Sequence, residues 1–216
     1  GIEMFRENFI NSFSHEFKTP IVSIQGFAKQ LKKENLSEEK KQEYIDIIIS
    51  ESKRLTNLSS NILMLSKLEN QQIITDKTSF SLDEQIRNCI LLLEKQWTAK
   101  DISFDTDMQE IQYTTNAEML SQVWVNIIGN AIKFSPENSK INFYTAETNT
   151  DFCQLVIQDS GLGMTQNTIN ELLQDSELLA KKKKSEIIGT GLGMQLCKQM
   201  IKKNGGTLAI ESELNK

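Results

Sequence analysis

The sequence predicts two folds in series, a helical hairpin that pairs with a second copy into a four-helix bundle and then an α/β domain. The first 70 residues contain a single proline, Pro20, and two glycines, so this stretch can be helical almost throughout. Residues 1–72 carry equal numbers of basic and acidic side chains, and the net charge of −5 falls on the remainder. Beyond the same point, short strand-like runs alternate with helical patterns.

Two apolar patterns mark the hairpin. The first has the three- to four-residue spacing of a helical stripe and consists of Phe9, Phe13, Phe17, Ile21, Ile24, Phe27 and Leu31. After a short loop at 35–37, the second repeats every seven residues, as in a coiled-coil seam; it runs through Ile48, Leu55 and Ile62 and is interleaved with Leu58 and Leu65. One hairpin cannot cover two apolar stripes by itself, so we expect a homodimer.

The remainder of the chain predicts mixed secondary structure after a linker at 70–79. Ser81 and Glu84 have the spacing of a capping box, which would start a helix that reaches about Thr98. Further elements are expected as strands near 102–105 and 112–114, a helix over 116–133, a strand pair at 141–147 and 152–159, a helix ending at 203 and a last strand over 207–211. The predicted domains are therefore 1–72 and 73–216.

Composition excludes several classes of protein. The acidic net charge argues against a nucleic-acid binder that works through bulk charge. The longest apolar run, 89–93, is far shorter than the roughly 18 residues that cross a bilayer, so we expect a soluble, cytoplasmic chain. Cys89, Cys153 and Cys197 are odd in number and far apart, which excludes a disulfide framework and a zinc site built on paired cysteines.

Histidine occurs once, at position 15. At 100° per residue, His15 falls opposite the first apolar stripe; Thr19 lies one turn along on the same face, and Glu16 on the shoulder next to the stripe. An ordinary surface histidine would have this placement too, and a metal site is not expected, because no second ligand accompanies it. The other role is that of a nucleophile toward a phosphoryl group, with Glu16 orienting or deprotonating the ring.

Two glycine turns frame the second half of the chain. The first follows a predicted strand and the second opens a helix; their members are Asp159, Gly161 and Gly163, and then Gly189, Gly191 and Gly193. Such turns let the backbone approach a ligand, and a helix N-terminus can present N–H groups to phosphate. Neither turn fits the dinucleotide-binding fingerprint, and the phosphate-loop motif is absent from the sequence.

Polar residues also interrupt the apolar helix predicted over 116–133. Asn126 and Asn130 are four residues apart and share a face, with Lys133 at the end of the helix. Buried amides need partners. An amide oxygen suits Mg²⁺ and an ammonium group suits phosphate, so the set fits a metal–triphosphate ligand. A polar cluster at a helix C-terminus is the alternative.

These strings together resemble the sequence boxes of the sensor histidine kinases of two-component systems. Residues 9–21 around His15 resemble the H-box, and 122–135 resemble the N-box. The two glycine turns are similar to the glycine boxes of the ATPase fold that histidine kinases share with type II topoisomerases and Hsp90-like chaperones. The match covers about 5–211 and implies a dimerisation domain followed by the Bergerat (GHKL) fold, a two-layer α/β sandwich with a mixed sheet.

The resemblance also implies an activity. ATP would phosphorylate His15 with Glu16 as base, and an aspartate of a response regulator would then take the phosphoryl group. Thr19 would position water for a phosphatase reaction, and Pro20 would bend the helix just after the site. The chain would work as a homodimer without nucleic acid, and would reach the membrane only through a sensor region ahead of it.

The resemblance likewise assigns the nucleotide site. It places Asn130 on Mg²⁺, Lys133 on phosphate, Asp159 on the adenine amino group and Asn126 along the site. The first glycine box frames the pocket through Gly161 and Gly163, and the second cradles the phosphates through Gly189, Gly191 and Gly193.

Two features depart from the family pattern. Family members generally continue past the strand expected over 207–211 into one more strand, which is not expected here. The F-box phenylalanines are absent between Thr165 and Ile188, where Lys181–Lys184 form either a solvated run or a contact to the triphosphate. Two alternatives therefore stay open: a pseudokinase that acts as a dimeric interaction module, and another ATPase of the same fold.

Overall fold

The computed structural model describes residues 2–33, 35–70, 75–149, 152–173 and 192–214. The chain divides into two compact units, Gly1–Asn70 with Gln174–Leu192, and Gln71–Leu173 with Gly193–Lys216. The described part of the first unit is almost entirely a helical hairpin, and the second unit combines strands and helices. The predicted order of a hairpin followed by an α/β domain is confirmed.

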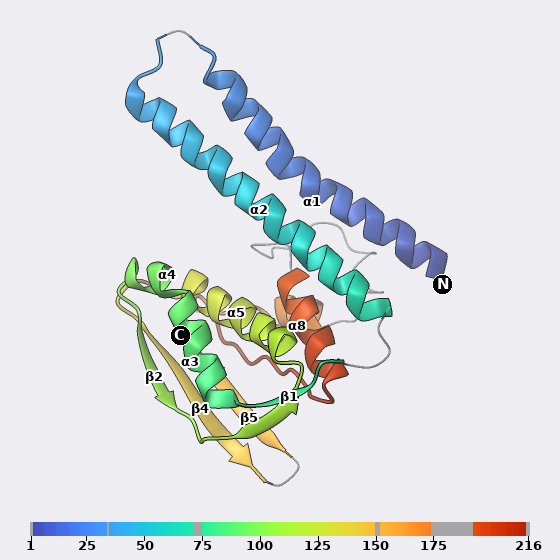
Figure 1. Ribbon diagram of the computed structural model, residues 1–216. Helices are drawn as coiled ribbons and strands as arrows, with labels where there is room; N and C mark the ends of the chain where they lie inside the picture. The colour runs from blue at the N-terminus through green and yellow to red at the C-terminus, as the bar shows by residue number, and fades with distance from the viewer. Residues whose placement is uncertain (1, 34, 71–74, 150–151, 174–191, 215–216) are drawn as a thin grey trace. The chain divides into compact units, whose positions relative to one another are not determined.

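The hairpin consists of α1 (Ile2–Gln30) and α2 (Glu38–Asn70), which lie side by side (Figure 1). Ser37 accepts a hydrogen bond from the backbone N–H of Lys40 at 3.3 Å, and two acidic residues occupy the first turn of α2, where the helix dipole favours negative charge. Pro20 is buried inside α1, and the helix continues through it.

A single hairpin leaves part of its apolar surface uncovered. Leu58 is buried and the rings of Phe27 and Tyr44 lie 5.2 Å apart between the helices. Val22 on α1 is nevertheless 54% exposed and Leu63 on α2 is 62% exposed. The large apolar side chains exposed on the hairpin are Ile21, Val22, Ile45, Ile49 and Leu63. Of these five, only Ile21 belongs to the predicted stripes. The pairing of two hairpins therefore stays a prediction.

The second unit contains a mixed sheet of three strands in the order β2-β4-β5. Strand β2 (Ser103–Asp107) runs parallel to β4 (Lys140–Thr148), and β4 runs antiparallel to β5 (Cys153–Gln158). A separate antiparallel pair joins β1 (Thr78–Ser81) to β3 (Gln112–Thr115). Strand β1 begins within the stretch predicted to be a linker; the other four lie within two residues of their predicted positions.

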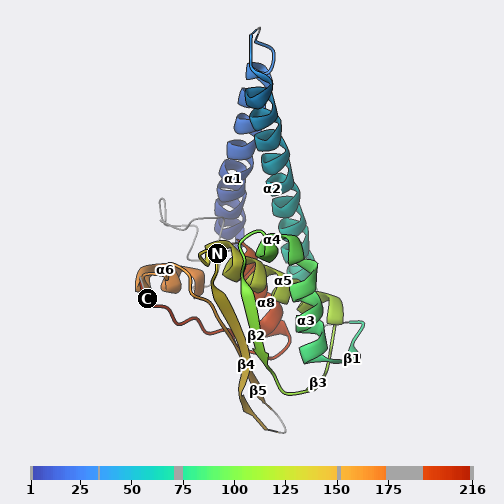
Figure 2. The ribbon, with the colours of Figure 1, turned by 90° about the vertical axis from the view of Figure 1, so that its left-hand side faces the viewer.

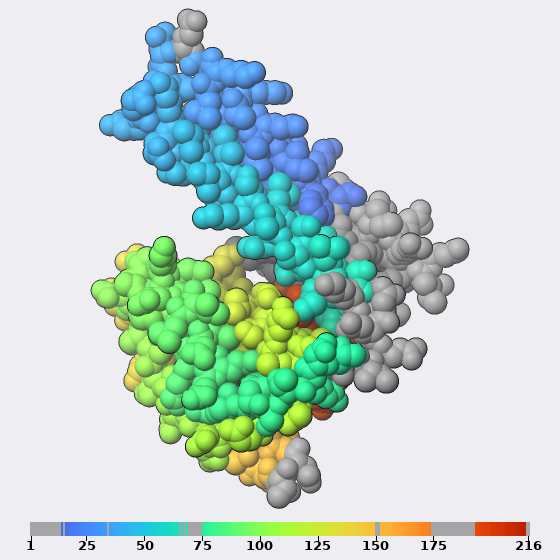
Figure 3. Space-filling model, in the orientation of Figure 1, coloured from blue at the N-terminus to red at the C-terminus, as the bar shows by residue number. Residues whose placement is uncertain are grey.

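Helices cover one face of the three-stranded sheet (Figure 2) and complete a two-layer architecture. They are α3 (Leu82–Leu92), α4 (Glu94–Thr98), α5 (Ala117–Phe134), α6 (Gln166–Leu173) and α8 (Leu192–Lys203). In the space-filling view, the green segment that includes α3 and α4 forms much of the visible face of this unit (Figure 3). The core between helices and sheet includes Ile86, Val123, Ile128, Phe143 and Leu196, all less than 2% exposed.

The helix predicted from Ser81 to Thr98 is wrong in two respects. It breaks at Leu93, where the indole N–H of Trp97 donates to the carbonyl of Ile90 at 2.9 Å. Ser81 stands at the N-cap, but the capping box does not form. Its hydroxyl donates to Asp83 Oδ1 at 2.5 Å. The Ser81 side chain is therefore bound to a carboxylate and does not accept the backbone N–H that a capping box requires.

The last predicted strand, over 207–211, is also wrong. Residues 207–213 follow an irregular path. In place of ladder hydrogen bonds, the hydroxyl of Ser212 accepts the backbone N–H of Met164 at 2.8 Å. This segment thus lies against the first glycine turn without extending the sheet.

Among the described helices, none is both long and apolar enough to cross a bilayer.

Candidate functional site

The sole histidine lies in α1, whose backbone places Glu16 next to it and Thr19 one turn further along. The side chain of His15 is outside the described part of the structure. Its neighbours on the predicted face, Lys18 and Thr19, are exposed, whereas Glu16 is half-buried. The helical wheel predicted the exposed position of Thr19 and the intermediate position of Glu16. The exposure of His15 stays a prediction.

Glu16 has an unusual electrostatic environment. Its Oε2 atom is buried and has no hydrogen-bond partner among the described residues. Arg54 of α2 is the cation that acts on it, and the guanidinium Nη1 of Arg54 also lies 3.6 Å from Glu51 Oε2. Burial raises the pKa of Glu16 from 4.5 to about 7, and the charge of Arg54 opposes part of that rise. A carboxyl group with a pKa near neutrality is suited to accept a proton.

In the second unit, the polar residues of α5 form one side of a second candidate site. Asn126 and Asn130 lie one turn apart, and the amide Nδ2 of Asn126 is buried without a hydrogen-bond partner among the described residues. A Cβ atom added to Gly193 would lie 3.6 Å from Asn126 Oδ1. The start of α8 therefore abuts α5 at a buried amide group, which also lies against the thiol of Cys197.

Cys197, one turn beyond Gly193, is fully buried behind this contact. Its thiol donates to the carbonyl of Val123 at 3.7 Å. Burial raises the pKa of Cys197 to about 12, so the thiol stays neutral and packs as a small apolar group.

The first glycine turn meets the other end of α5. Asp159 Oδ1 accepts the backbone N–H of Gly161 at 2.8 Å. A Cβ atom on Gly161 would lie 2.7 Å from the same oxygen and 3.2 Å from the carbonyl oxygen of Phe134, the last residue of α5. Glycine is required here because its backbone is enclosed on both sides.

Gly163 is constrained in a different way. Its φ is +73°, and a Cβ atom would collide with the backbone carbonyl of Glu213. Left-handed backbone and close approach both require glycine at this position. The chain segment after α8 therefore borders the first glycine turn, a contact that the sequence did not predict.

The C-terminal end of α5 carries a charge arrangement that the sequence missed as well. Lys133 is exposed, and its Nζ lies 4.9 Å from the centroid of the Phe134 ring. Lys100 donates from its ammonium group to the carbonyl oxygens of Ile132, Lys133 and Ser135 at 3.0, 2.8 and 2.9 Å. A lone lysine before a strand has no sequence signal that separates it from a solvated one.

The structure thus places six of the predicted nucleotide-site residues along or beside the second half of α5, while Gly163 borders the chain segment after α8. The six are Asn126, Asn130, Lys133, Asp159, Gly161 and Gly193. Gly189 and Gly191 lie outside the described residues, as do Lys181–Lys184 and the part of the stretch without an F-box that follows residue 173.

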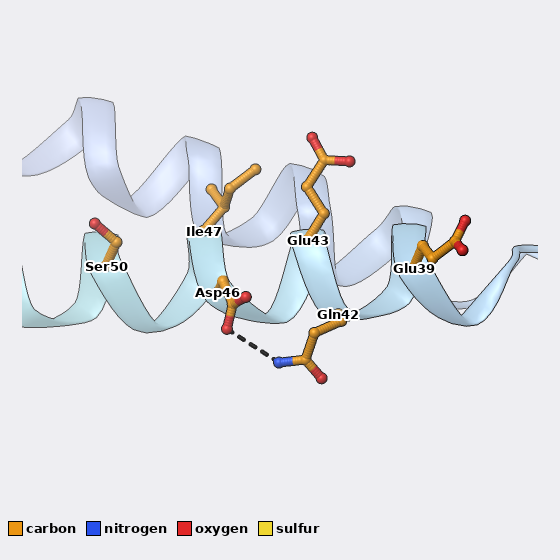
Figure 4. Close-up of a pocket in the computed structure, with 6 residues that line it drawn as sticks. All are labelled: Glu39, Gln42, Glu43, Asp46, Ile47 and Ser50. Carbon is orange, nitrogen blue, oxygen red and sulfur yellow. Dashed lines mark hydrogen bonds between the residues drawn. The ribbon is translucent and has the colours of Figure 1, made fainter.

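A hollow on the hairpin offers a contrasting environment. It lies along α2 and is lined by Glu39, Gln42, Glu43, Asp46, Ile47 and Ser50 (Figure 4). Gln42 donates to Asp46 at 3.1 Å, and three carboxylates would repel a phosphate. Across the described ranges, no cluster of three or more His, Cys, Asp or Glu side chains is arranged to hold a metal ion.

Comparison with known proteins identifies both parts of the chain. Residues 5–71 match the family model of the His Kinase A (phospho-acceptor) domain. Residues 115–216 match the family model described as histidine kinase-, DNA gyrase B-, and HSP90-like ATPase. The chain belongs to the histidine kinases. His15 lies within the first match, and α5, both glycine turns and α8 lie within the second.

Individual relatives agree with this assignment. Sporulation kinase C of Bacillus subtilis (strain 168) is 31% identical over 206 residues, which are 94% of this chain and 45% of that protein. Sensor protein SrrB of Staphylococcus aureus (strain MRSA252) is 25% identical over 225 residues, with 100% of this chain and 37% of that protein covered. This chain thus spans less than half the length of either relative.

Solved structures share the fold. The Acinetobacter baumannii histidine kinase AdeS matches with a TM-score of 0.70 at 21% identity, covering 93% of this chain and 92% of that one. The histidine kinase ThkA, solved in complex with the response regulator protein TrrA, matches with a TM-score of 0.68 at 25% identity, covering 89% and 53%.

The raised pKa of Glu16 predicts a pH-dependent stability difference for Glu16→Gln. In the folded chain Glu16 holds a proton up to about pH 7, but the unfolded chain releases it near pH 4.5. Protonated Glu16 therefore makes its whole contribution to the free energy of unfolding below pH 4.5. That contribution is lost as the pH rises through 7. Because the side chain is partly solvated, we expect the variant to be more stable than the parent by only about 1 kcal/mol above pH 8.

Thermal unfolding of both proteins at about pH 5 and pH 8.5, at one chain concentration, checks this. The variant's advantage should appear at the higher pH and vanish at the lower one. An equal difference at both values would show that Glu16 is ionised in the folded state.

Proposed function

We propose that this histidine kinase chain is a catalytic core in which domain 1–72 carries the phosphoacceptor His15 and domain 73–216 binds ATP. The observation that carries the proposal is that one glycine from each glycine turn, Gly161 and Gly193, abuts α5. Gly193 abuts the buried amide of Asn126, and Gly161 abuts the last carbonyl of the same helix. Backbone without side chains and an unsatisfied amide together are typical of a ligand site.

The residues present fit a nucleotide with its metal ion. The buried Asn126 amide makes no hydrogen bond to an oxygen or nitrogen acceptor among the described residues and can donate to a ligand. The Asp159 carboxylate, held by the N–H of Gly161, can accept from the adenine amino group. Lys133 would bind phosphate, and the amide oxygen of Asn130 suits Mg²⁺. The ion would neutralise charge on the phosphates. Gly161 and Gly163 would leave room for the nucleotide at the first turn, and Gly189, Gly191 and Gly193 would cradle the phosphates.

The proposed reaction is phosphoryl transfer from ATP to His15. A ring nitrogen of neutral imidazole attacks the γ-phosphorus, a P–N bond forms as the bond to the bridging oxygen breaks, and ADP leaves. The proton on the other ring nitrogen passes to the carboxylate of Glu16. The pKa of Glu16 near 7 matches that task.

The phosphoryl group would then pass to an aspartate of a response regulator, as the P–N bond is exchanged for a P–O bond. Thr19 is exposed on α1 one turn beyond His15. Its hydroxyl is no useful base for imidazole, but it can orient a water that hydrolyses the regulator's phosphoaspartate. One helix turn would thereby serve both kinase and phosphatase reactions.

The assembly we propose is a homodimer of hairpins. The exposed apolar side chains of α1 and α2, such as Val22 and Leu63, supply the surface that a second hairpin would cover. We place this core in the cytoplasm, attached to the membrane through a sensor region ahead of it in the full protein.

The first test is His15→Gln. Because His15 is the sole histidine, the variant should incorporate no acid-labile, alkali-stable phosphate from [γ-³²P]ATP. Its dissociation constant for ATP should stay within about threefold of the parent value, a change of about 0.65 kcal/mol. Loss of ATP binding would contradict the two-domain assignment. ATP binding without phosphorylation of the unaltered chain would favour the dimeric interaction module.

The second test is Gly161→Ala with Gly129→Ala as its matched control. The first change forces a methyl group between Asp159 and the end of α5, and we expect at least about a tenfold loss of ATP affinity. A Cβ on Gly129, within α5, meets no atom within 4 Å. This control should bind ATP normally and gain about 0.5–1 kcal/mol of stability. Calorimetric titration that finds equal affinities would remove Gly161 from the site.

The third test separates the two reactions attributed to α1. Thr19→Ala should keep most autophosphorylation and lose phosphatase activity toward the regulator. Glu16→Gln removes the proton acceptor and should lower autophosphorylation by about a hundredfold or more, while the phosphatase reaction continues. Both activities are measured on both variants with purified phosphorylated regulator. If Thr19→Ala autophosphorylates as poorly as Glu16→Gln, the division of roles is wrong.

A further inference from the structure

Lys100 occupies a fixed turn between α4 and β2. Its backbone N–H donates to the carbonyl of Trp97 at 3.2 Å, and its own carbonyl accepts the N–H of Asn138 at 2.9 Å. Asp101, the next residue, adopts a left-handed φ of 54°. The turn is therefore held from both sides, and the lysine stem extends from an anchored base.

The ammonium group of Lys100 uses all three of its protons on one helix end. It reaches the carbonyl oxygens of Ile132, Lys133 and Ser135 at 2.8–3.0 Å. The last carbonyls of a helix have no partners within the helix, and they carry the negative end of its dipole. Lys100 thus supplies hydrogen bonds and a positive charge to the C-terminus of α5.

That end of α5 is where the proposed phosphate contacts are. Lys133 is in the last turn, Asn130 is in the turn before it, and the Phe134 carbonyl borders Gly161. A polyphosphate beside the C-terminus of a helix would meet unfavourable carbonyl dipoles. The charge of Lys100 offsets these carbonyl dipoles. Its hydrogen bonds also fix the last turns of α5, which carry Asn130 and Lys133.

We propose that Lys100 is a positioning residue for the phosphates of the bound nucleotide, acting through the C-terminus of α5 without touching the ligand. The inference rests on the proposed function of this site in ATP binding. It predicts that removing the charge of Lys100 weakens binding in proportion to the number of phosphates on the ligand, which a role in stability alone would not do.

The experiment compares the affinity for ATP and for adenosine, each measured by displacement of a fluorescent ATP analogue in the presence of Mg²⁺. Lys100→Met removes charge and donors, Lys100→Gln keeps donors without the charge, and Lys100→Arg keeps both. Lys140→Met is the matched control, since Lys140 is exposed and pairs with Asp105 on the surface at 2.8 Å. Circular dichroism and thermal unfolding check that each variant is folded.

We expect Lys100→Met to lose about tenfold in ATP affinity and less than about threefold in adenosine affinity. Lys100→Gln should fall between Lys100→Met and the parent, and both Lys100→Arg and Lys140→Met should bind ATP like the parent. If Lys100→Met does not fold, the contrast between Lys100→Gln and Lys100→Arg decides. Unchanged ATP affinity, or equal losses for both ligands, would overturn the proposal. Failure of the parent chain to bind ATP would instead contradict the proposed function.

Discussion

Helix α5 is fixed at both ends by side chains that satisfy backbone groups the helix cannot satisfy itself. At its N-terminus, Asn116 accepts the N–H of Met119 at 2.9 Å and donates to the carbonyl of Thr75 at 3.1 Å. At its C-terminus, the ammonium group of Lys100 takes three carbonyl oxygens. Gly161 and Gly193 both contact this helix, so the geometry of the proposed nucleotide site depends on how firmly α5 is held.

The contacts after α8 secure the same helix from another side. Asn204 donates to the carbonyl of Met200 at 2.7 Å, and its side-chain oxygen accepts from the buried hydroxyl of Thr115, just before α5 begins. The end of α8 is thereby tied to the start of α5, while the start of α8 abuts Asn126. Helices α5 and α8 therefore contact each other at both ends. These contacts fix the distance between Asn126 and Gly193.

Elements with a clear period could be predicted from the sequence. The helix expected over 116–133 is α5, Ala117–Phe134, and the expected strand pair is β4 with β5. The failures involve competition between side chains: Asp83 takes the hydroxyl of Ser81, and the Trp97 indole takes a carbonyl where α3 ends. Such choices depend on distances of a few ångströms, which a hydrophobic pattern does not contain.

The same distinction applies to the residues of the candidate site: some could be predicted from the sequence and others could not. Glycine and asparagine spacing indicated Gly161, Gly193 and Asn126, because the chemistry of a ligand site limits which residues can stand there. Lys100 acts across more than 30 residues of sequence and had no signal. The raised pKa of Glu16 depends on burial and on Arg54 from the other helix, and the sequence indicated its carboxylate but not the environment.

Pro20 has a mechanical consequence for the hairpin. It has no N–H, so the carbonyl of Glu16, four residues earlier, receives no helical hydrogen bond from it. The helix runs through this position all the same. Bending α1 here breaks no hydrogen bond between residues 16 and 20, so the helix bends more easily one turn from His15 than it would if that bond were present. A bending force on α1 would therefore produce curvature preferentially around residues 16–20, within one turn of His15.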